Sequence, residues 1–255
     1  MKLRSTVGLV CLGLFVSAAV LAPGCFGVSQ EVTKTYPMRA DGIFELNNVN
    51  GTVRIEGWDK NEAEVRAIKS TPEDGSLLDL VAIDVDATAE GLSVSTRYPQ
   101  QEGVEVVVDY VIHVPRHAQL SRVNNINGAV RVFSSESLGE LHTVNGNIEI
   151  YESSGDVHAH TTNGNIYLEL KHANDAKGAS VETTNGSVLL AIPQDLAAEL
   201  EARCMNGSFS SDLPMVMKGE AQPRTVHGAR GHGGAPIHLG TVNGTIRVVA
   251  LRSTV

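Results

Sequence analysis

The dipeptide Asn-Gly recurs along this chain at a nearly constant spacing, and the residues on both sides of it recur as well. Successive copies begin 16 to 22 residues apart, at Asn127, Asn145, Asn163, Asn185, Asn206, a degenerate His227, and Asn243. An earlier copy stands at Asn50. Self-similarity at a fixed period is the signature of a repeat architecture. The sequence therefore says more about construction than about activity.

Each repeat contains two stretches in which polar and apolar residues alternate. In one copy these stretches are 147–151 and 156–161, with Ser154-Gly155 between them. Alternation with period two, broken by turn residues about every nine positions, predicts two strands and two turns for each repeat. A single copy would fit an antiparallel hairpin with an Asn-Gly turn equally well. Repetition in one register favours parallel stacking of the copies.

The apolar residues of successive copies fall into common columns. Two positions after each Gly stand Val130, Ile148, Ile166, Val188, Phe209 and Ile246, and four after it stand Val132, Ile150, Leu168, Leu190, Ser211 and Val248. These columns predict an all-β fold, a parallel β-solenoid of about six rungs of 18–22 residues that stack at roughly 4.8 Å. The copy at His227 is expected to bulge or loop out, and 243–251 to form the terminal strand.

The corner of each rung is predicted at the Asn-Gly dipeptide, because both residues tolerate left-handed backbone geometry. Stacked Asn amides can hydrogen-bond to one another along a ladder. The predicted corner ladder consists of Asn127, Asn145, Asn163, Asn185, Asn206 and Asn243.

Residues 35–120 are also rich in predicted strands, but on a different rhythm. The strands are longer and joined by short turns, which favours antiparallel pairing. We expect a sandwich-like antiparallel β section that caps one end of the solenoid. The predicted organisation is a signal peptide at 1–24, a tether at 25–36, this N-terminal β section at 37–119 and the solenoid at 120–255.

The N-terminus reads as an export signal, with Lys2 and Arg4 followed by an apolar run and then Cys25. A Cys at this place resembles the lipobox of bacterial lipoproteins, which implies lipidation of Cys25 and a membrane anchor, at the outer membrane in a two-membrane cell. Ordinary secretion and an uncleaved anchor are the alternatives. Without residues 1–24, 18 basic and 29 acidic side chains remain, a net charge of −11. Such a surface disfavours nucleic acid as a partner.

Three runs carry a family resemblance, namely 43–46, 50–59 and 111–115, followed by the Asn-Gly repeats. Together they resemble the bacterial putative-adhesin family of β-strand-repeat proteins, a domain of unknown function. The resemblance implies a noncatalytic protein exposed at the cell envelope, with a role in adhesion or envelope stress. It supplies no catalytic residues.

Histidines are the main candidates for metal chemistry. His142, His158 and His160 should point outward near Glu140 and Glu182, and His227, His232 and His238 flank a glycine-rich stretch. We interpret the first group as a solvated polar ladder and the second as a flexible loop, and we predict no metal and no cofactor. Cys204 occupies an inward column and is interpreted as a small core residue.

Two classes of function fit these features. The first is a noncatalytic envelope protein, an adhesin or scaffold that binds a protein or polysaccharide ligand. The alternative is a carbohydrate-active β-helix enzyme, a lyase or hydrolase of cell-wall polysaccharide, which needs clustered carboxylates and usually aromatic platforms. Aromatic residues make up 4% of the chain and no outward column stacks Asp on Asp. The sequence therefore favours a protein that is not an enzyme.

Overall fold

A computed structural model describes residues 27–100, 103–171, 178–217 and 224–251. The predicted signal peptide and Cys25 lie outside these residues. No helix in the described ranges is long and apolar enough to cross a membrane.

The described chain is all-β, with one short 3-10 helix, η1, at Gly75–Leu80. The strands of the N-terminal part are β1 (Val28–Pro37), β2 (Ile43–Asn47), β3 (Val53–Trp58), β4 (Glu62–Thr71), β5 (Ala82–Ala87), β6 (Gly91–Arg97) and β7 (Val107–Pro115). The repeats supply β8 (Gln119–Asn127), β9 (Val130–Phe133), β10 (Leu138–Asn145), β11 (Ile148–Ser153), β12 (Asp156–Asn163), β13 (Ile166–Leu170), β14 (Gly178–Asn185), β15 (Val188–Ile192), β16 (Ala198–Ser211), β17 (Val216–Met217), β18 (Thr225–Arg230) and β19 (Ala235–Ala250).

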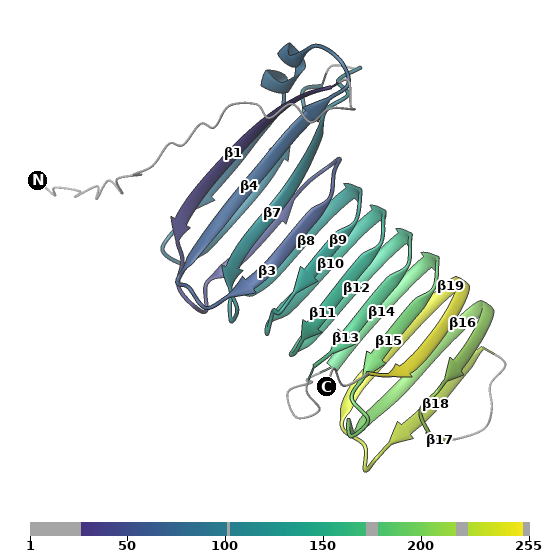
Figure 1. The fold of residues 1–255 in the computed structure, drawn as a ribbon. Helices are drawn as coiled ribbons and strands as arrows, with labels where there is room; N and C mark the ends of the chain where they lie inside the picture. The colour runs from purple at the N-terminus through teal and green to yellow at the C-terminus, as the bar shows by residue number, and fades with distance from the viewer. Residues whose placement is uncertain (1–26, 101–102, 172–177, 218–223, 252–255) are drawn as a thin grey trace, which may run out of the picture.

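These strands form one large mixed sheet that folds back on itself, so that two layers face each other across the core (Figure 1). The first layer runs β5, β6, β2, β8, β10, β12, β14, β19, β16, β18, β17. The second layer runs β1, β4, β7, β3, β9, β11, β13, β15, β19, β16. The long strands β16 and β19 pass through the Asn-Gly corner and contribute to both layers.

Successive repeats pair in parallel and in the predicted register. Ile148 lies opposite Ile166, and Ile166 opposite Val188. Of the residues predicted for the two inward columns, all but Phe209 and Ser211 are buried. Stacking like on like removes each apolar side chain from water, at a gain of roughly 25 cal/mol per Å² of apolar surface.

The spatial order of the last repeats differs from the prediction. β19 does not end the stack; it lies between β14 and β15 on one side and β16 on the other. β18, which carries His227, runs antiparallel along the outer side of β16. The physical reason lies in the columns: β19 contributes Ile246 and Val248, whereas β16 contributes the weaker pair Phe209 and Ser211. Burying the more apolar strand leaves the more polar one at the end.

The N-terminal part is not a separate antiparallel unit. β2 pairs in parallel with β8, and β3 pairs in parallel with β9. Antiparallel pairing occurs between β1 and β4, β4 and β7, and β5 and β6. Asn50 forms a parallel bridge with Asn127, because the sequence Asn-Gly-Thr-Val that begins at Asn50 resembles the sequences of the later corners. The sheet thus continues across residue 119, and the domain division there stays a prediction.

Candidate functional site

The corner of the sheet carries a row of stacked Asn amides. Six side-chain hydrogen bonds of 2.8–2.9 Å join seven residues in the spatial order Asn50, Asn127, Asn145, Asn163, Asn185, Asn243 and Asn206. Each amide nitrogen donates to the oxygen of the neighbour nearer β2. Asn50 was not among the residues predicted for this ladder. Much of the hydrogen-bonding capacity of the corner is therefore used within the protein.

A second polar row lies just inside the first. The hydroxyls of Thr143, Thr161 and Thr183 each donate to the carbonyl of the corner glycine in the adjacent repeat, at 2.8–3.1 Å. Cys204 takes the Thr position in β16, where burial raises the pKa of its thiol. A thiol with a raised pKa is a weak nucleophile, which agrees with the prediction of a core residue.

The outer face of the first layer brings two of the predicted histidines together. The rings of His142 and His160 stack with centroids 5.4 Å apart. Burial, and then the neighbouring His160, lower the pKa of His142 against the opposing effect of Glu140. Within the described ranges, no group of three or more His, Cys, Asp or Glu side chains is arranged to hold a metal ion. His158 and Glu182 lie exposed on this face.

A shallow polar recess opens further along the same face, where Gly240 interrupts a column of long side chains. Its volume is about 250 Å³, and its lining includes Glu182, Glu201, Arg203 and His238. Glu201 contacts both Arg203 and His238, the latter at 3.5 Å. The recess thus holds two carboxylates, one of which contacts the Arg203 guanidinium and the His238 ring. Of the three histidines near the glycine-rich stretch, His238 lines it; His227 lies on β18 and His232 in the turn that follows.

The outer face of the second layer carries stacked rings from three successive strands (β9, β11 and β13). Phe133 and Tyr151 stack with centroids 4.9 Å apart and an interplanar angle of 7°, and Tyr151 contacts Tyr167 at 5.0 Å. The Arg54 guanidinium covers the free side of Phe133, 4.2 Å from its centroid. We call Phe133, Tyr151 and Tyr167 the aromatic row. All three are half-buried, so that ring edges, more than ring faces, meet the solvent.

Charged side chains flank the aromatic row. The Tyr151 hydroxyl donates to Glu149 at 3.2 Å, and the Tyr167 hydroxyl donates to Glu169 at 2.9 Å. Burial and the bond to Glu169 raise the pKa of Tyr167. Arg131 forms an ion pair with Glu149 at 2.9 Å. Both tyrosine hydroxyls of the row, and the Arg131 guanidinium beside it, thus have partners that hold them in place.

The aromatic row was missed at the sequence level, although a signal for it existed. Phe133 and Tyr151 are 18 residues apart, the repeat length in that part of the chain. The low aromatic content of the whole chain gave no indication that the repeat places these rings on one face.

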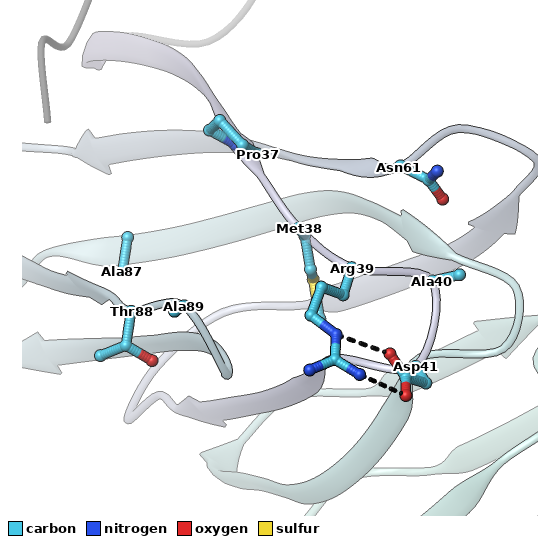
Figure 2. Close-up of a pocket in the computed structure, with 9 residues that line it drawn as sticks. All are labelled: Pro37, Met38, Arg39, Ala40, Asp41, Asn61, Ala87, Thr88 and Ala89. Carbon is cyan, nitrogen blue, oxygen red and sulfur yellow. Dashed lines mark hydrogen bonds and ion pairs between the residues drawn. The ribbon is translucent and has the colours of Figure 1, made fainter.

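A wider pocket lies where three turns meet at one end of the first layer (Figure 2). Its volume is about 710 Å³, and it is lined by 37–41, Asn61 and 87–89. Arg39 and Asp41 bind each other at 2.8 and 3.0 Å. Because its charged groups neutralise each other and small side chains form much of the wall, the pocket offers little to hold a ligand in one orientation.

These features define an all-β repeat protein with two extended outer faces and shallow recesses. The chain belongs to the Toastrack DUF4097 family, whose profile matches residues 31–249. No curated protein matches the chain significantly.

The chain is similar to several solved structures, one of which shares its fold at a TM-score above 0.5. A "putative cell adhesion protein" from Clostridium sporogenes superposes with a TM-score of 0.54 at 10% identity, over 88% of this chain and 100% of that one. A "putative adhesin" from Bacteroides fragilis gives a TM-score of 0.31 at 11% identity, over 87% and 97%. A "putative lipid binding protein" from Parabacteroides distasonis gives 0.34 at 10% identity, over the same shares.

Proposed function

We propose that this chain is a noncatalytic binding protein of the cell envelope, coiled as a β-solenoid, that holds its partner on the aromatic row. The observation that carries this proposal is the stack of Arg54, Phe133, Tyr151 and Tyr167 on the outer face of the second layer. Adhesion, the activity named for the Clostridium sporogenes protein, is the role we propose here.

The chemistry of the row suits binding rather than catalysis. Tyr and Arg side chains are enriched among the residues that contribute most to binding. Rings held by stacking lose little conformational freedom when a partner arrives, which lowers the cost of association. Glu149 and Glu169 add acceptors for hydroxyl or amide donors beside the rings. We favour an envelope polysaccharide as the partner, since sugars combine apolar C–H surfaces with many hydroxyl donors.

Binding to isolated cell-wall polysaccharide tests this proposal. The double variant Phe133→Ala/Tyr151→Ala should reduce retention on immobilised polysaccharide at least tenfold. His142→Ala/His160→Ala is the matched control, because it removes a stacked pair from the opposite layer. Equal retention of the two variants, or binding to an envelope protein in place of polysaccharide, would contradict this choice of face or ligand.

We also propose that Cys25 is lipidated and anchors the protein to a membrane, the outer membrane where the cell has one. Cys25 precedes the start of β1 at Val28 by three residues, so an anchor there would hold this end of the sheet close to the bilayer. Cys25→Ser should release the protein from the membrane fraction. If a labelled fatty acid does not become attached to Cys25 in wild-type cells, the hypothesis is wrong.

A carbohydrate-active enzyme remains the second candidate, and the recess at Gly240 is the observation that favours it. Glu182 and Glu201 are two carboxylates in one polar depression, the minimum set for glycoside hydrolysis. A reducing-end assay on cell-wall polysaccharide should show no activity if the protein only binds. Activity that disappears in Glu201→Gln, with binding retained, would establish the enzyme.

A further inference from the structure

The second half of β16 is a sheet edge that no described strand covers. The first half, up to Arg203, pairs with β19 on one side and with β18 on the other. From Asn206 to Ser211, β16 pairs with β19 alone. Figure 1 shows β16 beyond β19 at this end of the sheet, with β18 and β17 beside its first half.

The interior repeats show which backbone groups of β16 face the missing neighbour. In three of them the N–H of the corner glycine donates to the next Asn carbonyl: Gly128 to Asn145, Gly146 to Asn163, and Gly164 to Asn185. The N–H two residues after that glycine donates in the same direction, as in Val130 to Asn147. By this rule the N–H groups of Gly207 and Phe209 point away from β19. In the described residues no acceptor meets them.

The side chains of this edge also lack their neighbours. Phe209 occupies the column of Ile148, Ile166 and Ile246, all fully buried, yet it remains half-exposed. The Asn206 amide donates to Asn243, and no donor among the described residues reaches its own oxygen. The core column and the amide ladder both stop one strand short of the pattern that the interior repeats follow.

The edges formed by β1 and β5 carry charges, which discourage strand addition. β1 contains Glu31 and Lys34, and β5 contains Asp84 and Asp86. The segment 204–211 of β16 contains no charged residue. Uncharged, unpaired backbone is a template for an incoming strand.

We propose that the second half of β16 binds an extended, uncharged peptide as an additional parallel strand, with an Asn of the peptide opposite Asn206. The peptide Asn amide donates to Asn206 Oδ1, its backbone N–H donates to the Met205 carbonyl, and an aliphatic side chain two residues after its Gly covers Phe209. A polypeptide with the pattern x-Asn-Gly-x-aliphatic meets all three requirements.

A second copy of this chain fits the edge less well. In the first layer, β18 and β17 extend beyond β16, so the same strands of a second copy would meet them before its β16 edge could approach. A single peptide strand avoids β17 and β18 when it begins opposite Met205, since the Cys204 N–H already donates to the Arg224 carbonyl at 3.0 Å. The proposal concerns a different surface from the aromatic row and does not depend on its ligand.

The test uses a fluorescent peptide of the sequence Thr-Asn-Gly-Ser-Val-Leu-Leu, which is that of 184–190, and the mature protein. In the proposed register the peptide Asn N–H faces β16, whereas its Gly N–H faces solvent. N-methylation of the Asn nitrogen should weaken binding at least about tenfold, since one hydrogen bond is worth about 1.4 kcal/mol in this setting. N-methylation of the Gly nitrogen should change binding less than about twofold.

The variant Phe209→Pro gives a second measurement, because it removes an outward N–H while the pairing with β19 uses the alternate residues. This variant should bind the peptide at least tenfold more weakly than the wild type. Thermal melting checks that the variant is folded. Absence of saturable anisotropy up to about 1 mM peptide, or equal effects of the two N-methyl groups, would overturn the proposal. The proposal would also be overturned if sedimentation showed a dimer in which a second copy covers the β16 edge and excludes the peptide.

Discussion

The side chain of Asn243 donates a 2.8 Å hydrogen bond to Asn185 Oδ1, 58 residues earlier in the chain, and accepts one of 2.9 Å from Asn206. The last described strand therefore lies between two strands that precede it. β19 completes both layers at this point and separates β16 from the rest of the sheet.

Removal of β19 should consequently do more damage than removal of an end strand. A chain that stops after Gly234 loses the partner of β16 along 13 residue pairs. We expect rapid proteolysis between 193 and 234, with protection retained in β8 to β13. A chain that stops after Leu251 is the control and should resist protease like the full protein. Equal resistance of the two truncations would contradict the position of β19.

The register predicts opposite responses at two adjacent residues of β13. Ile166 is buried between Ile148 and Val188, whereas Tyr167 lies on the outer face. An unpaired carboxylate in Ile166→Asp should lower the free energy of unfolding by several kcal/mol, of the order of the stability of a domain. Tyr167→Ser should lower it by about 1 kcal/mol, the value of an aromatic contact. Urea denaturation measures both, and a larger loss from the tyrosine change would reverse the assignment of faces.

Corner glycines should tolerate no side chain, for a steric reason. A Cβ on Gly164 would lie 1.9 Å from the carbonyl oxygen of Gly146, a backbone atom that cannot move alone. A Cβ on Gly240 would lie 3.3 Å from Glu182 Cγ, which is free to shift. Gly164→Ala should therefore cost several kcal/mol, and Gly240→Ala less than about 1 kcal/mol. Melting temperatures that fall equally would refute this distinction.

Acid should weaken the first layer through His142. The pKa of His142 is lowered in the folded protein by burial and by His160. Above the unfolded pKa of about 6.5 the ring is neutral in both states and costs nothing. As pH falls through that value, the unfolded chain takes up the proton first and folding loses free energy.

Other groups titrate over the same range, so the difference between the wild type and His142→Gln isolates this effect. Chemical denaturation between pH 7.5 and 4.5 should show a smaller loss of stability in the variant. His158→Gln, an exposed histidine on the neighbouring strand, is the control for loss of charge. A His142→Gln curve parallel to the wild type would remove His142 as a cause.

The inward columns were predictable because the repeat fixes them: Ile148, Ile166 and Val188 follow their Asn-Gly by the same distance and all are buried. The parallel pairing of β10 with β12 follows from the same pattern. Spatial order was less predictable, because copies with equivalent columns stack in any sequence. Only the polarity of Ser211 against Val248 indicated which strand would be outermost.

The outer faces were predicted least. His142 and His160 were expected to share a face, but their ring stacking depends on rotamers that spacing does not determine. The aromatic row joins residues of unlike type from three repeats, and an inward-column analysis passes over them. Asn50 was recognised as an earlier copy, yet the longer strands around it indicated a separate antiparallel section.

The interior position of β19 has a consequence for the time course of folding. A chain that folds in the order of synthesis presents β16 to the open side of β14 and β15 before β19 exists. Because Asn206 and Ala202 match the same columns, β16 can pair there in register and form a kinetic trap. Its Phe209 and Ser211 fill the columns less well than Ile246 and Val248, so this pairing is weaker than the native one and opens readily to protease. Reaching the native state then requires strand exchange, in which β16 leaves and β19 enters. Parallel strands pair slowly because distant segments must meet. The regularity that stabilises the finished sheet thus delays its completion.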